Sequence, residues 1–104
     1  MFDQRAMKDM MRQAQEMQSK MEAAQAALAQ EQVHGSAGGG MVTAIVTGQL
    51  DLTSITINRE VVDPDDVEML QDLVLSAVRD ALEKAKELQQ EKLGAVTGGL
   101  QLPF

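Results

Sequence analysis

The sequence has no cysteine, tryptophan or tyrosine and only two phenylalanines among its 104 residues. Without cysteine it forms no disulfide, no thiolate metal site and no cysteine nucleophile. With so few aromatic rings it has no set of platforms on which single-stranded bases could stack. It also lacks an apolar run near the roughly 20 residues that span a bilayer, and it lacks a charged-then-apolar leader. We therefore expect a cytoplasmic protein with no membrane partner.

Positive charge is scarce. Nine Lys and Arg face sixteen Asp and Glu, which gives a formal net charge of −7. A phosphate backbone is on average repelled by that balance, so any contact with nucleic acid must come from a local patch of cations. The length is that of one domain, and we treat residues 1–104 as a single unit.

A glycine-rich stretch, Gly35–Gly40, has the GxxxxG spacing of a phosphate-binding loop. Such a loop needs Lys and a hydroxyl after its last glycine, followed by a helix. Here Met41 and Val42 follow, at the start of a β-branched segment. We therefore interpret the stretch as a turn between strands, in which glycine supplies positive φ.

Other catalytic or metal-binding patterns are weak. His34 is the only histidine, so no His pair can hold a metal and no conventional triad can form. The carboxylates Asp63, Asp65 and Asp66 lack the spacing of a calcium loop, and helix capping accounts for them. We expect no catalytic residue, cofactor, metal or small-molecule substrate, and hence no enzyme.

Residues 1–31 are predicted to hold a long N-terminal helix, because residues 5–31 contain no Gly or Pro and many strong helix formers. Its apolar positions repeat at alternating spacings of three and four, which is the pattern of a coiled-coil seam. This apolar seam consists of Met7, Met10, Ala14, Met17, Met21, Ala24 and Leu28. Arg5, Lys8 and Arg12, here called the cation stripe, lie on the opposite side, and Lys20 follows two turns further along.

Residues 32–60 are predicted to form a three-stranded antiparallel sheet. Met41–Thr47 and Thr53–Asn58 alternate with period two, with Ile55 and Ile57 on one face. A turn at Gly48–Asp51 joins them as a hairpin. Glu31–Ser36 is predicted to add a third strand across the glycines.

Residues 64–93 are predicted to form a second long helix. Asp63 is placed as its N-cap and Pro64 at its first position, where the missing N–H costs nothing. Gly94 is placed just past its last residue. The remainder, 94–104, is expected to be a mobile tail.

Simple geometry argues for a second copy. Each helix should extend roughly 40 Å, whereas strands of this length cover roughly 20 to 26 Å. One small sheet cannot cover both helices, so the open part of the apolar seam and any exposed strand edge need another chain. A two-fold homodimer is the simplest solution.

The cation stripe admits two interpretations. Asp9 and Glu16 lie close to it, so it can be a solvated face with ion pairs inside the helix. In a dimer the stripe occurs twice, and two such faces could contact a duplex backbone without reading bases.

Three segments resemble the YbaB/EbfC family of small bacterial nucleoid-associated proteins. They are MMRQAQEMQSKM at Met10–Met21, GSAGGGMVTAIVTG at Gly35–Gly48, and DLVLSAVRDALEKAKELQQEKLGAVTGGLQLP at Asp72–Pro103. The resemblance covers nearly the whole chain in the right order. It implies an α+β protomer of order α-β-β-β-α and a tweezers-like homodimer that binds double-stranded DNA on the nucleoid.

The resemblance further implies a role in chromosome organisation and gene regulation with weak sequence preference, and it supplies no catalytic residues. We assign DNA contact to Arg5, Lys8, Arg12 and Lys20, with Lys84, Lys86 and Lys92 as weaker candidates. A prefoldin-like chaperone or protein-interaction module is the alternative, because two coiled-coil helices joined by hairpin strands describe that class too.

Overall fold

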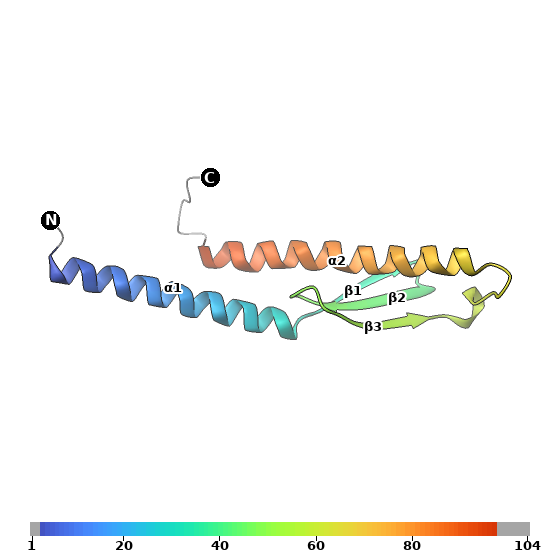
Figure 1. Cartoon of the computed structure of the whole chain (residues 1–104), viewed down its shortest axis with the longest axis horizontal. Coiled ribbons are helices and arrows are strands. Elements are labelled where there is room, and N and C mark those ends of the chain that lie inside the picture. The colour runs from blue at the N-terminus through green and yellow to red at the C-terminus, as the bar shows by residue number, and fades with distance from the viewer. Residues whose placement is uncertain (1–2, 98–104) are drawn as a thin grey trace.

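The computed structural model describes residues 3–97 and confirms the order α-β-β-β-α (Figure 1). Its elements are α1 (Gln4–Gln30), β1 (Gln32–Ala37), β2 (Val42–Thr47), β3 (Leu52–Ile57), a 3-10 turn η1 (Arg59–Val61) and α2 (Val67–Thr97). The molecule measures 74 × 25 × 16 Å, and its two helices run in opposite directions along the long axis (Figure 1).

The turn between β1 and β2 is the one predicted from the glycines. Gly38, Gly39 and Gly40 have φ values of 65, 68 and 94°, a region that side chains rarely adopt. The strands pair antiparallel in the order β1-β2-β3. Ile55 and Ile57 lie opposite Ala44 and Val42 respectively, and so share one face, as predicted.

α2 packs directly on β1 and β2. Ala77, Ala81 and Ala85 on the helix are fully buried, as are Val42, Ala44 and Val46 on β2. Small residues on both sides let the helix backbone approach the sheet. A Cβ added at Gly35 would overlap the backbone nitrogen of Ala81 and lie 2.5 Å from the carbonyl oxygen of Ala77. Gly35 is therefore required where α2 crosses β1.

Two predicted boundaries of α2 were wrong. The helix begins at Val67 rather than Pro64, and Asp66 accepts the N–H of Met69 at 3.2 Å as its cap. Asp63 instead closes a separate turn, in which it accepts the N–H groups of Asp65 and Asp66. Proline at the second position of this turn fits its fixed φ.

At its other end α2 continues through Gly94 to Thr97. A single glycine costs a helix about 1 kcal/mol, and it is tolerated where the following residues keep packing. Ala95 and Val96 do so, because they line a groove against α1. The predicted tail at 94–104 thus begins no earlier than residue 98, and 98–104 lie outside the described residues.

α1 is attached to the rest of the fold at its C-terminal end. The N–H of Gly48 donates to the carbonyl oxygen of Leu28 at 2.9 Å, and the Gln49 side chain donates to the carbonyl oxygen of Gln25 at 2.8 Å. Leu28 is 1% exposed. At the far end of the same seam, Met7 is 56% and Met10 58% exposed. The seam is thus buried at Leu28, half-buried at Met17, Met21 and Ala24, and exposed at Met7 and Met10.

Candidate nucleic-acid interface

Arg5 and Lys8 of the cation stripe precede the residues of α1 that line a groove against α2, whereas Arg12 lies within that span without lining the groove. Met10 to Lys20 line the groove against Ala95 and Val96, near the end of α2, so earlier residues extend past that helix (Figure 1). We call residues 4–12 the α1 arm. Asp3 begins the helix by accepting the N–H of Ala6 at 2.7 Å. Helical spacing then places Arg5, Lys8 and Arg12 on one side of the arm.

The stripe is exposed and mostly unpaired. Arg12 forms an ion pair with Asp9 at 3.5 Å, and both side chains are more than 60% exposed. Such an exposed pair contributes little to stability, about 0.3–0.5 kcal/mol, so it releases Arg12 readily to another anion. Arg5 and Lys8 form no ion pair within residues 3–97.

Lys20 is separated from the stripe. It lines the groove between the two helices together with Glu16 and Val96, whereas none of the three cations of the stripe lines that groove. The four residues assigned to DNA therefore fall into a group of three and a single lysine nearer the body of the molecule.

Lys84, a weaker candidate, has a structural role. Its Nζ donates to Asp80 at 3.0 Å and to the carbonyl oxygen of His34 at 3.5 Å. Asp80 also accepts the backbone N–H of Ser36 at 3.0 Å. The two side chains thus cover part of the free edge of β1. The i, i+4 spacing of an acid and a lysine in the sequence predicts their ion pair, but the contacts of both with β1 depend on residues far away in the sequence.

These contacts lower the pKa of Asp80 below its ordinary value of 3.8, chiefly through the hydrogen bond from Ser36 and then through Lys84. The charged form is favoured in the folded state. The ionised Asp80 carboxylate therefore stabilises the fold fully at pH values above its pKa in the unfolded chain. This stabilisation is lost as pH falls through its lower pKa in the folded protein.

Asp80→Asn should accordingly reduce the acid sensitivity of the fold. We expect the variant to be less stable than the wild type at pH 7 and to lose less stability between pH 7 and pH 3. Urea unfolding at both pH values measures this, with Glu83→Gln on the same helix as control. Identical acid dependence of stability in Asp80→Asn and wild type would contradict a lowered pKa of Asp80 in the folded protein.

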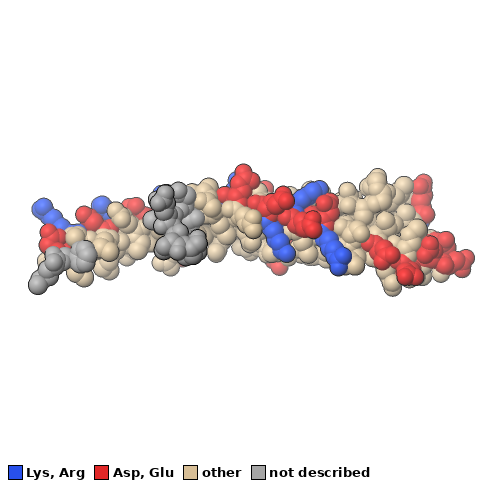
Figure 2. All heavy atoms as spheres, turned by 90° about the horizontal axis from the view of Figure 1, so that it is seen from above, with Lys and Arg blue, Asp and Glu red and all other residues tan. Residues whose placement is uncertain are grey.

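The negative charge of the chain is concentrated at one end (Figure 2). Residues 59–72, here called the acidic segment, carry six carboxylates against one cation, Arg59. The carboxylates are Glu60, Asp63, Asp65, Asp66, Glu68 and Asp72. In contrast, residues 3–30 carry four cations and four carboxylates, and residues 73–97 carry the same numbers. Both long helices are thus close to neutral along most of their length.

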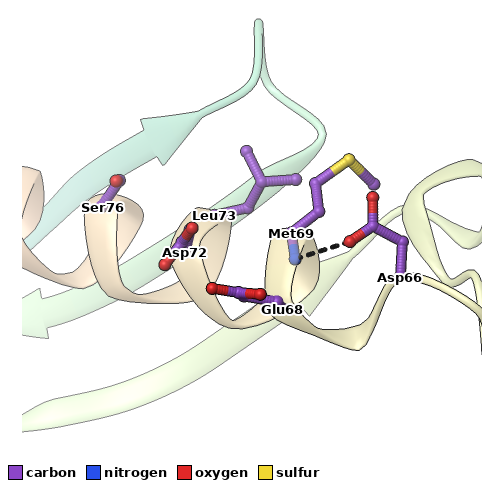
Figure 3. Close-up of a pocket in the computed structure, with 6 residues that line it drawn as sticks. All are labelled: Asp66, Glu68, Met69, Asp72, Leu73 and Ser76. Carbon is purple, nitrogen blue, oxygen red and sulfur yellow. Dashed lines mark hydrogen bonds between the residues drawn. The ribbon is translucent and has the colours of Figure 1, made fainter.

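A hollow of about 340 Å³ lies in the acidic segment, where α2 begins. Figure 3 shows Asp66 turned toward the N–H of Met69, while Glu68 and Asp72 lie on another side of the helix. No group of three or more His, Cys, Asp or Glu within residues 3–97 is placed to hold a metal ion. Asp66, rather than the predicted Asp63, acts as the helix cap.

Among the described helices, none combines the length and apolar character needed to cross a membrane.

Comparison with known proteins identifies relatives over nearly the whole chain. The family model described as the YbaB/EbfC DNA-binding family matches residues 3–100. A nucleoid-associated protein of Alkaliphilus metalliredigens is 50% identical over 97 residues, which cover 93% of this chain and 85% of the relative. One of Saccharopolyspora erythraea is 55% identical over 94 residues, covering 90% and 81%.

A solved structure shares the fold. The crystal structure of the uncharacterized protein HP0035 from Helicobacter pylori superposes with a TM-score of 0.70 at 19% sequence identity. The match covers 88% of this chain and 92% of that one.

Proposed function

The chain belongs to the YbaB/EbfC DNA-binding family, and from that premise we propose that it binds double-stranded DNA as a homodimer. The contacts come from Arg5, Lys8, Arg12 and Lys20 of α1. Sequence preference is weak, and the dimer acts on the nucleoid, in the cytoplasm, in chromosome organisation and gene regulation. The proposal gives it no catalytic role.

The distribution of charge is the observation that carries this proposal. The net charge of −7 argues against DNA binding only if it is spread over the surface. Its largest share lies in the acidic segment, at the opposite end of a molecule 74 Å long from the α1 arm. The Debye length is about 8 Å at physiological salt, so carboxylates at that distance are screened from DNA held at the arm.

Weak sequence preference follows from the chemistry of the stripe. Lys and Arg on an exposed helix face bind phosphate oxygens, which fix the position of a protein but carry no sequence information.

Binding to two unrelated duplexes of equal length tests this function. We expect fluorescence anisotropy at fixed salt to give dissociation constants within about fivefold of each other, because phosphate contacts dominate. A preference of about 1000-fold, typical of base readout, would contradict the proposal. The chaperone alternative would instead give higher oligomers in light scattering and suppression of aggregation.

A half-covered sheet supports the homodimer. α2 lies over β1 and β2, while β3 extends to its side (Figure 1). On β3, Leu52 is 47%, Ile55 40% and Ile57 38% exposed, although Ile55 and Ile57 share the face that α2 covers elsewhere. A second copy that covers this strip would remove large apolar side chains from water.

The two edges of the sheet also differ, and the difference favours a dimer contact at β3. Asp80 and Lys84 occupy backbone groups on the edge of β1. Among the described residues no side chain from a helix binds the outer edge of β3 in this way. An open edge beside an apolar strip is the natural site for an isologous two-fold contact, so we place the dimer interface at β3.

Ile55→Asp tests that interface. A carboxylate placed in an apolar contact should weaken dimerisation at least about 100-fold, because desolvating it costs several kcal/mol. Sedimentation equilibrium measures the monomer–dimer constant. Thr56→Asp is the matched control, since Thr56 pairs with Thr43 and points to the other face. If both variants dimerise like the wild type, the interface lies elsewhere.

A further inference from the structure

A groove of about 640 Å³ lies between α1 and the end of α2. Met10, Ala14 and Met17 of the apolar seam line one side, flanked by Gln13, Glu16 and Lys20, and Ala95 and Val96 line the other. Methionine is flexible enough to pack against irregular apolar groups. The groove thus offers an apolar surface at the point where α2 stops covering α1.

The seam continues past the groove without cover. Met10 and Met7 are both more than half exposed, and the last described residue of α2 is Thr97. α2 runs antiparallel to α1 (Figure 1), and its Ala95 and Val96 share the groove with Met10 and Met17, so the direction of α2 continues toward the N-terminal end of the seam. The next segment of the sequence therefore starts where the uncovered seam starts.

That segment, residues 98–104, has the composition of a strip that could cover the seam. It reads Gly-Gly-Leu-Gln-Leu-Pro-Phe and contains no Lys, Arg, Asp or Glu. Leu100, Leu102 and Phe104 alternate, which places all three on one side of an extended chain. Proline disfavours the helical region for the residue before it, and a glycine pair is unfavourable inside a helix, so the sequence of this segment favours an extended chain.

The length of the segment also fits. At about 3.3 Å per residue, residues 98–104 span roughly 23 Å when extended. Met17 and Met7 are separated by roughly 15 Å along α1, at about 1.5 Å per residue. The segment can therefore reach from the groove to Met7 within its own chain.

We propose that residues 98–104 dock in the groove between α1 and α2 of the same chain and continue over Met10 and Met7. The three apolar side chains of the segment complete the cover that α2 leaves unfinished. The docked segment joins the α1 arm to α2. This inference does not depend on DNA binding, and its test uses the protein without DNA.

Hydrogen exchange of the full-length protein tests the docking. In Leu100→Ser/Leu102→Ser/Phe104→Ser, we expect amides of residues 7–17 to exchange at least about fivefold faster than in wild type, because local opening becomes easier. Amides of β2 should not change. Gln101→Ser, on the other side of an extended chain, is the matched control. Exchange of residues 7–17 that is unaffected by the triple substitution would overturn the proposal.

A spin label then distinguishes the same chain from a second copy. The absence of cysteine allows a nitroxide to be attached at Gln101→Cys alone. We expect it to broaden the methyl resonances of Met10 and Met17 when label and methyl group are on one chain. Broadening only in mixed samples, with label and methyl group on different chains, would show that a second copy's segment occupies the groove and would overturn the proposal.

Discussion

Replacing Gly35 with alanine is expected to lower the free energy of unfolding by about 3 kcal/mol and the melting temperature by more than about 10 °C. The new Cβ would overlap backbone atoms of Ala81 and lie 2.5 Å from the carbonyl oxygen of Ala77. Backbone cannot turn aside as a flexible side chain can, so α2 must move away from the sheet. That movement would loosen Ala77, Ala81 and Ala85 from β2.

The same substitution at Gly94 is the control. Gly94 lies inside α2, and an added Cβ would meet nothing within 4 Å. Alanine has a higher helix propensity than glycine, so Gly94→Ala should raise stability by up to about 1 kcal/mol. Thermal unfolding at one fixed protein concentration compares the two variants, because the melting temperature of a dimer depends on concentration. A Gly35→Ala protein that melts within about 2 °C of wild type would contradict the packing of α2 on β1.

Removing the cation stripe is expected to weaken DNA binding at least about 100-fold near 50 mM salt. In the proposed dimer, Arg5→Ala/Lys8→Ala/Arg12→Ala removes six cations, each placed to displace counterions from phosphate. Alanine preserves the helix, so the loss should come without a change in circular dichroism. Anisotropy with a plain duplex measures the affinity.

A second triple variant controls for net charge. Arg79→Ala/Lys86→Ala/Lys92→Ala removes the same charge from α2, and two of its three positions, Lys86 and Lys92, are the weaker candidates for DNA contact. We expect its affinity to fall less than about fivefold, as for a general change in the field around the protein. Equal losses in the two variants would contradict the assignment of DNA contact to the α1 arm.

Local sequence rules predicted most of the secondary structure. The glycines at 38–40 predicted a turn because only glycine adopts positive φ at little cost, and all three do so. Period-two alternation predicted the shared face of Ile55 and Ile57, which the register confirms. These features depend on neighbours in the sequence, which is why the sequence was sufficient.

Three features were missed, because two local turns competed with the simplest pattern and one helix end depends on contact with α1. Asp63 satisfied the rules for a helix cap, but the local turn with Pro64 competes for its side chain, and Asp66 caps α2 instead. Gly94 resembled a helix end, but Ala95 and Val96 continue the helix along α1. Leu50 has φ of 70°, a strained value that no pattern predicted.

The candidate interface was predictable only in outline. Helical spacing alone is enough to place Arg5, Lys8 and Arg12 on one side of α1. Lys20 differs from them because it lines the groove between α1 and α2, and Lys84 differs because it bonds to Asp80 and His34. Both differences depend on how α2 packs against α1 and β1, which helical spacing alone does not predict. Assignment of all these cations to DNA stays a prediction.

The salt dependence of DNA binding tests the central claim most directly. If the three cations of the stripe on each chain contact about six phosphates per dimer, log affinity for a plain duplex should fall with log salt at a slope near −5. The purified protein, titrated with one duplex between about 50 and 300 mM salt, gives that slope. A slope near zero, or no binding at the lowest salt, would contradict the proposal that the α1 arms bind the DNA backbone.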